Sequence, residues 1–188
     1  MVALGFENAT CTVIGNAIGA NQKYLAKRFF KVAMTTILPI FALISALLVA
    51  YSESLAQFLV YPGDSLDLML RIIPIIAVFF VLDGLRANLE GVIKALSLQY
   101  VGAMLTFIAI FMILLPTAVY LAFIQEMGLV GFWLGSCIGL SVQVVFYLGL
   151  ILSADWDEIT DDVQGRLETQ AELFGGAYDF GDRNLSDL

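Results

Sequence analysis

Four long runs of apolar residues, separated by short polar segments, dominate the pattern of this chain. The runs cover residues 30–51, 68–96, 100–124 and 129–152. Because a helix that crosses a bilayer needs about 20 mostly apolar residues, each run is long enough for a complete transmembrane helix. Residues 1–21 are rich in Gly, Ala and Thr, and their apolar stretch is too short for a complete span, so we expect a partial helix there. The pattern predicts an all-α membrane protein, a helical bundle with about four complete transmembrane helices and a partial first one.

The amino-acid composition favours the same class. Of the 188 residues, 60% are hydrophobic and 14% are charged, with a mean hydropathy of +0.90. Soluble domains contain about 45–50% apolar and about 25% charged residues. The composition therefore indicates a protein whose partner is the lipid bilayer.

The charges divide the chain into two parts. Residues 155–188 hold ten of the 17 acidic residues and two of the nine basic ones, so the net charge of −8 belongs to this segment. Residues 1–154 are neutral overall and contain all the apolar runs. High net charge and low apolar content are typical of disordered segments. We therefore expect a transmembrane bundle over residues 1–154 and a mostly disordered acidic tail over residues 155–188.

Basic residues gather on one side of the predicted bundle. Lys23, Lys27, Arg28 and Lys31 precede the first complete span, and Lys94 ends the second. Cytoplasmic loops are enriched in Lys and Arg, and the tail falls on the same side, so the C-terminus is predicted to be cytoplasmic. We expect an integral, multi-pass protein of the plasma membrane or an endomembrane.

Residues that carry enzyme chemistry are scarce. The chain has no histidine, and its two cysteines, Cys11 and Cys137, lie far apart among small and apolar residues. Carboxylates are then the groups best suited to exchange protons near neutral pH. The sequence shows no nucleophile–base pair, metal-ligand cluster or phosphate-binding loop. We expect neither an enzyme nor a metal, cofactor or nucleic-acid site.

Charged residues interrupt the second complete span on one face. Arg86, Glu90 and Lys94 follow Asp83 at i+3, i+7 and i+11, and such positions share one face of a helix. A carboxylate inside a membrane helix costs about 2.5–3.5 kcal/mol on insertion scales and marks a functional site by default. Arg86 can pair with Asp83 and with Glu90.

Two interpretations of this face remain open. In the first, Asp83 takes up a proton or binds a cation, and we favour this interpretation for Asp83. In the second, the charges form a neutralised ladder of ion pairs, which we favour for Glu90 and Lys94. Glu7 is the other acid in a membrane-like segment. It either faces the same cavity or lies near the outer end of its helix.

Several short motifs follow one another along residues 8–158. Val13–Asn21 is similar to V-G-N-x-L-G-A-G-N, and Asp83–Lys94 with the following Gln99, Gly102 and Ala103 resembles D-G-L-Q-x-x-x-x-G-x-x-R…Q-x-x-G-A. Further similarities lie at Leu115-Pro116 (G-L-P), Gly128–Gly135 (G-x-x-G-L-W-x-G) and Asp155–Asp157 (T-D-W). In order and spacing these motifs resemble those of the multidrug and toxic compound extrusion (MATE) transporters.

The resemblance implies part of a secondary active antiporter that exports organic cations, drugs or toxic compounds in exchange for H⁺ or Na⁺. Family members have twelve helices in two lobes, and the chain aligns with the second lobe from late in helix eight onward. The family's acid in helix ten, associated with cation coupling, falls on Asp83. Arg86 stands where Gln is usual and Glu90 where a small residue is usual, and an Arg beside the coupling acid can lock it in a salt bridge.

The resemblance also bears on partners. Alternating access needs two lobes around a central site, so the expected partners are a small organic substrate and either a first lobe or a full-length relative. The alternative is a truncated, non-transporting membrane subunit that packs against a full-length transporter and modulates it.

Overall fold

The computed structural model describes residues 1–60 and 63–183, with side chains up to residue 170 except that of Asp64. The regular elements in these segments are all helical, as the apolar pattern predicts. They are α1 (Val2–Gly19), α2 (Lys23–Ala50), α3 (Ser52–Leu59), α4 (Asp64–Ala95), α5 (Gln99–Ile108), η1 (Ala109–Leu114), α6 (Leu115–Val119), η2 (Tyr120–Ile124), α7 (Gly128–Ser153) and α8 (Trp156–Arg183).

Four helical segments in the described part of the chain are long and apolar enough to cross a membrane. They are Lys23–Ala50, Ser65–Ala95, Gln99–Ile124 and Gly128–Ser153. The fold class predicted from the apolar runs is therefore confirmed. The first span differs in one respect, because α2 already begins at Lys23 and its first three turns carry the basic cluster.

The third span is not a uniform α-helix. It passes from α5 through the π-helical segment η1 into α6 and then into the π-helical segment η2. Pro116 is the second residue of α6, two positions after the end of η1. Because proline has no N–H to donate and its ring crowds the preceding turn, the regular hydrogen-bond pattern cannot continue through it. The wider π-helical turn accommodates this break.

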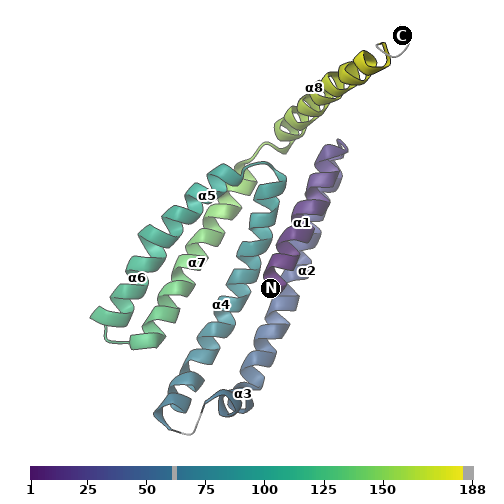
Figure 1. The fold of residues 1–188 in the computed structure, drawn as a ribbon. Coiled ribbons are helices and arrows are strands. Elements are labelled where there is room, and N and C mark those ends of the chain that lie inside the picture. The colour runs from purple at the N-terminus through teal and green to yellow at the C-terminus, as the bar shows by residue number, and fades with distance from the viewer. Residues whose placement is uncertain (61–62, 184–188) are drawn as a thin grey trace.

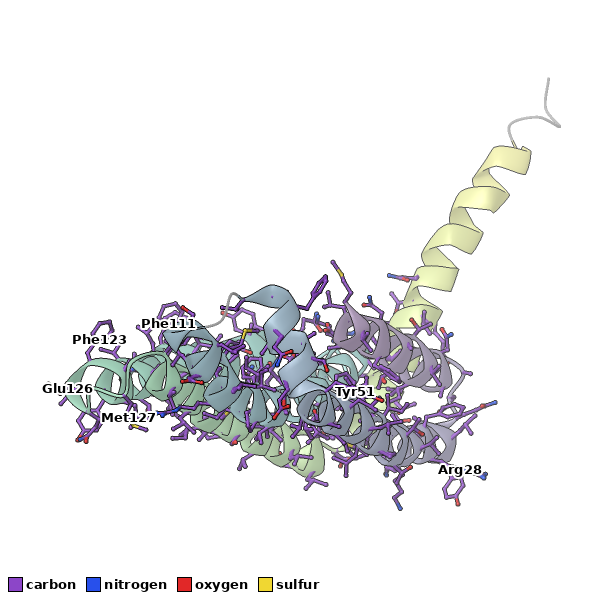
Figure 2. The ribbon with its side chains drawn as sticks, turned by 90° about the horizontal axis from the view of Figure 1, so that it is seen from below. Arg28, Tyr51, Phe111, Phe123, Glu126 and Met127 are labelled. Atoms are coloured by element: carbon purple, nitrogen blue, oxygen red, sulfur yellow. The ribbon has the colours of Figure 1, made fainter. Side chains whose placement is uncertain are left out.

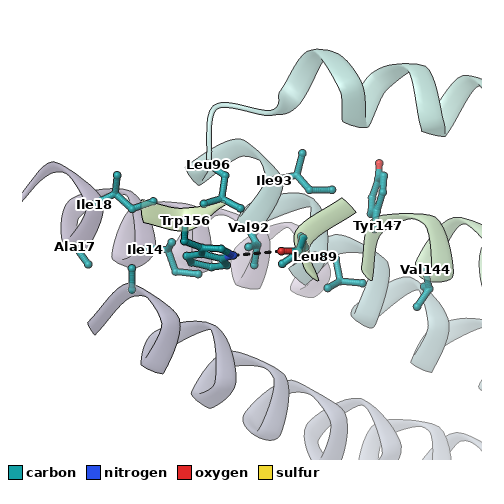
Figure 3. Packing of buried hydrophobic residues seen from close by; sticks show 12 residues of the cluster. Ile14, Ala17, Ile18, Leu89, Val92, Ile93, Leu96, Val144, Tyr147 and Trp156 are labelled. Carbon is teal, nitrogen blue, oxygen red and sulfur yellow. Dashed lines mark hydrogen bonds between the residues drawn. The ribbon is translucent and has the colours of Figure 1, made fainter. Parts of the chain in front are cut away.

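Helix α4 is the central element of the bundle. Figure 1 shows it between α7 on one side and the α1–α2 pair on the other, and it packs against all three. The best buried apolar residues come from these helices and include Ile14, Ile18, Leu89, Val92 and Tyr147 (Figure 3). Any polar residue on the inner faces of α4 is consequently surrounded by helices rather than by lipid.

The outside of the bundle is apolar. Large side chains such as Val78, Phe111, Phe123 and Val145 are exposed. Figure 2 shows Phe111 and Phe123 projecting away from the helices that carry them. Such a surface suits a bilayer, in which all the backbone groups of a spanning helix are paired internally and its outer side chains contact acyl chains.

Glycines set the distance between α7 and the third span. A Cβ at Gly131, Gly135 or Gly139 would overlap Leu121, Ala118 or Leu114 respectively. The three glycines follow one another at four-residue intervals and therefore share one face of α7. They form the stripe of small residues through which the two helices approach closely.

The acidic segment after α7 begins with one further helix. Residues 156–183 form the single helix α8, and residues 184–188 lie outside the described part. The backbone N–H groups of Glu158 and Asp157 donate to Oδ1 of Asp155, at 3.2 and 2.9 Å, and cap the start of the helix. These two hydrogen bonds hold the pKa of the Asp155 carboxyl below its usual range.

Contacts with the bundle also order the start of α8. Trp156 is 8% exposed, and its indole Nε1 donates to the carbonyl oxygen of Ile151 at 3.2 Å (Figure 3). Lys23 of α2 lies 2.7 Å from a carboxylate oxygen of Asp161. Acidic side chains that composition alone assigns to a solvated tail thus find basic partners within the same chain.

Candidate functional site: a charge cluster between two helices

The charged residues of α4 lie along one face, as their spacing predicts. Arg86 donates from Nε and Nη2 to Oδ1 of Asp83, at 3.1 and 2.9 Å. Its Nη1 donates to Oε2 of Glu90 at 2.6 Å, and Oε1 of Glu90 lies 3.3 Å from Nζ of Lys94. Both ion pairs that the spacing allows Arg86 are therefore formed. The guanidinium bridges two carboxylates and is shared between them.

Glu7 of α1 joins this row from a neighbouring helix. Its carboxylate accepts a hydrogen bond from Nζ of Lys94, although the two residues are 87 positions apart in the chain. Glu7 is 5% exposed and lies at the contact between α1 and α4. Of the two positions left open by the sequence, the structure places Glu7 among the charges of α4.

Gly91 allows α1 and α4 to approach closely enough for the Glu7–Lys94 ion pair. A Cβ at this position would overlap the backbone carbonyl oxygen of Glu7. The backbone of α1 therefore rests directly on α4 at Gly91, three residues before Lys94. Any larger residue at position 91 would separate the two helices and with them the Glu7–Lys94 ion pair.

We refer to Glu7, Asp83, Arg86, Glu90 and Lys94 as the charge cluster. It contains three carboxylates and two basic groups, so with every group ionised its net charge is −1. The side chains of the four inner members are shielded by protein, with exposures of 6% for Glu7, 22% for Arg86, 28% for Glu90 and 30% for Asp83. Because charges attract more strongly where water is scarce, an unbalanced negative charge here favours the uptake of one cation.

Sequence reasoning missed a buried polar pair beside the charge cluster. Asn88 is fully buried, and its Oδ1 accepts a hydrogen bond of 2.6 Å from Oγ1 of Thr10. Within the described residues, Nδ2 of Asn88 has no hydrogen-bond partner. The signal in the sequence was an amide inside an apolar run, which commonly points to a helix contact.

A second polar group missed from the sequence links α5 to α7. Nε2 of Gln143 lies 3.2 Å from both Oγ1 of Thr106 and the hydroxyl of Tyr147, and these two oxygens are 2.5 Å apart. Thr106 and Tyr147 also line a pocket of about 330 Å³ together with Glu90 and Lys94. The charge cluster therefore borders a cavity between α4, α5 and α7. Gln143 was the available signal, as an amide in the middle of an apolar helix.

The arrangement of acids gives no sign of a multidentate metal site. Among the residues that the structure describes, no three His, Cys, Asp or Glu side chains are grouped so that they could hold a metal ion. The carboxylates of the charge cluster are each engaged with a basic side chain. A carboxylate in such a setting can bind a proton or a monovalent cation.

Comparison with known proteins gives a consistent family assignment. The family model described as MatE matches residues 1–121. Multidrug and toxin extrusion protein 1 of Pongo abelii is 27% identical over 164 residues, and multidrug and toxin extrusion protein 2 of Mus musculus is 29% identical over 175 residues. These alignments include 87% and 92% of this chain but 29% and 30% of the two relatives. The chain thus spans about a third of the length of such proteins.

The fold has a counterpart among solved structures. The crystal structure of the eukaryotic MATE transporter AtDTX14 superimposes with a TM-score of 0.83 at 22% sequence identity. The superposition covers 88% of this chain and 37% of that one. An inward-facing multidrug resistance MATE family transporter superimposes with a TM-score of 0.75 over 86% of this chain. The helical bundle is therefore the fold of part of a MATE transporter.

Proposed function

This chain belongs to the MatE family, and we propose that it forms part of a secondary antiporter that exports organic cations, drugs or other toxic compounds in exchange for H⁺ or Na⁺. Relatives that bear the name multidrug and toxin extrusion protein support the substrate class. Because the chain covers about a third of their length, its activity is proposed for a complex or a longer protein that supplies the opposite lobe. The other partners are the bilayer and a small organic substrate.

The charge cluster is the main structural support for this proposal. An acid inside an apolar span is costly unless it is paired or serves transport. Among the described residues, the one ion-pair partner of Asp83 is the guanidinium of Arg86, which also pairs with Glu90. The two bases cannot neutralise all three acids. Binding of one H⁺ or Na⁺ at Asp83 completes the balance.

The ion pairs suggest how occupancy of Asp83 acts on the bundle. When a cation neutralises Asp83, the attraction that holds Arg86 to Oδ1 is lost, and Arg86 pairs with Glu90 alone. Glu90 then attracts Lys94 less strongly, because its charge is better compensated. Lys94 also pairs with Glu7 on α1, so neutralisation of Asp83 alters the ion pairing at the contact between α1 and α4. A rocking motion of helices around a central site is the usual basis of alternating access.

The sidedness of the charges supports an orientation with the C-terminus in the cytoplasm. The basic start of α2, the end of α4 with Lys94 in its last turn, and the start of α8 lie at one end of the bundle (Figure 1), where Lys23 contacts Asp161. Enrichment of Lys and Arg is a mark of cytoplasmic ends. The alternative of a non-transporting subunit has no observation in its favour.

A transport assay tests the proposed function. Vesicles that hold a transport-active protein containing this sequence are loaded with a fluorescent organic cation and then given an opposing H⁺ or Na⁺ gradient. We expect efflux above that of empty vesicles with at least one of the two gradients, and collapse of that gradient should stop it. Efflux at the same rate with and without either gradient would contradict an antiport mechanism.

A further inference from the structure

A pocket of about 380 Å³ lies where α2 begins and where α7 passes into α8. It is separate from the charge cluster, and basic, aromatic and aliphatic side chains line it. Basic groups come from the start of α2, aromatic rings from α2 and α8, and aliphatic groups from the end of α7. The residues that matter are Tyr24, Arg28, Phe30, Lys31, Leu152 and Trp156.

The polar side chains of the pocket share one face of α2. Arg28 follows Tyr24 by four residues and Lys31 follows Arg28 by three, which is the spacing of neighbours on a helix surface. Lys27 also lines the pocket but already lies 3.5 Å from Asp157 of α8. Arg28 and Lys31 are exposed and have no ion-pair partner among the described residues, and Figure 2 shows Arg28 projecting from the bundle. Two cationic groups of this pocket are thus free to bind an anion.

The rest of the lining is apolar and shaped by aromatic packing. The rings of Phe30 and Trp156 lie 6.0 Å apart, and the indole N–H of Trp156 is already bonded to Ile151. Leu152 is 76% exposed on the side of the last turn of α7. A soluble anion would gain nothing from these groups, whereas an acyl chain would be shielded by them.

The position of the pocket also suits a lipid. It lies at the end of two membrane-spanning helices, where aromatic residues typically mark the depth of the headgroups. Clusters of basic residues next to a transmembrane helix attract anionic headgroups. Acidic side chains of α8 pair with Lys23 and Lys27 but, within the described residues, not with Arg28 or Lys31.

We propose that this pocket binds an anionic phospholipid. Its headgroup phosphate pairs with Arg28 and Lys31, and its acyl chain lies along Leu152 and the ring of Phe30. The bound lipid would link the start of α2 to the junction of α7 and α8, and the proposal does not depend on transport activity.

Native mass spectrometry of the full chain released from nanodiscs tests this proposal. With phosphatidylglycerol in the nanodisc we expect bound lipid to remain, and with phosphatidylcholine much less. In the double variant Arg28→Gln, Lys31→Gln we expect about 25-fold weaker retention of phosphatidylglycerol, since each basic group near the surface contributes about fivefold. Equal retention by this variant and the parent chain would overturn the proposal.

Two controls make the result specific. Arg166→Gln removes a positive charge from α8 outside the pocket, where Arg166 pairs with Asp162, and should retain phosphatidylglycerol like the parent chain. Soluble glycerol 3-phosphate should not displace the lipid, and displacement would show a phosphate site rather than a lipid site. If thermal unfolding shows that the double variant is not folded, Lys31→Gln alone should lower retention about fivefold.

Discussion

Asp83→Asn is expected to reduce cation-driven efflux to the level of empty vesicles. The amide has almost the same shape as the carboxylate, so the packing of α4 should be kept. It neither takes up a proton at neutral pH nor attracts Na⁺ as an anion does. The substitution also balances the charge cluster permanently, with two acids against two bases. Transport that depends on filling and emptying this site would then have no site to use.

The matched control for this variant is Asp67→Asn on the same helix. Asp67 is exposed near the start of α4 and lies outside the charge cluster. The chemical change is identical, and efflux should stay close to that of the parent protein. Efflux and the amount of protein per vesicle are measured for the parent protein and for both variants. Undiminished efflux by Asp83→Asn at equal protein content would reject Asp83 as the coupling residue.

Gly91→Ala is expected to destabilise the bundle by about 1–3 kcal/mol, the usual cost of overpacking a close contact. The added methyl group would meet the backbone carbonyl oxygen of Glu7, which cannot turn away as a flexible side chain could. The two helices must therefore separate, which also lengthens the Glu7–Lys94 ion pair. Thermal unfolding of the purified protein in detergent, followed by circular dichroism, should show a lower midpoint.

Gly149→Ala provides the control for a glycine-to-alanine change in a membrane helix. A Cβ at Gly149 of α7 has no atom within 4 Å. Because alanine is the better helix former, this variant should be as stable as the parent chain or more stable by about 0.5–1 kcal/mol. An equal midpoint for Gly91→Ala and Gly149→Ala would mean that the close approach of α1 to α4 does not hold the bundle.

The row of charges on α4 could be predicted because it depends on one helix alone. Once residues 68–96 are recognised as a span, helical periodicity places Arg86, Glu90 and Lys94 on the face of Asp83. The place of Glu7 could not be predicted in this way. It depends on where α1 crosses α4, and that crossing is fixed by Gly91 and by the packing of side chains far apart in the sequence.

The start of α8 depends on contacts that composition cannot reveal. Charge and low apolar content describe the average of residues 155–188, whereas the first turns of α8 are held by particular contacts. Asp155 caps the first turn, Trp156 is anchored on Ile151, and Asp161 pairs with Lys23. The cap can be recognised from sequence, but the basic partner on α2 becomes visible only in the folded chain.

If Asp83 of the charge cluster holds one monovalent cation, equilibrium binding to the purified protein will detect it, with radioactive Na⁺ for sodium and a pH indicator in weak buffer for protons. We expect one Na⁺ or one H⁺ to bind per chain near neutral pH, and we expect Asp83→Asn to lose this binding while Asp67→Asn keeps it. Binding of neither ion by the parent protein, or equal binding by the Asp83→Asn variant, would rule out Asp83 as the cation site.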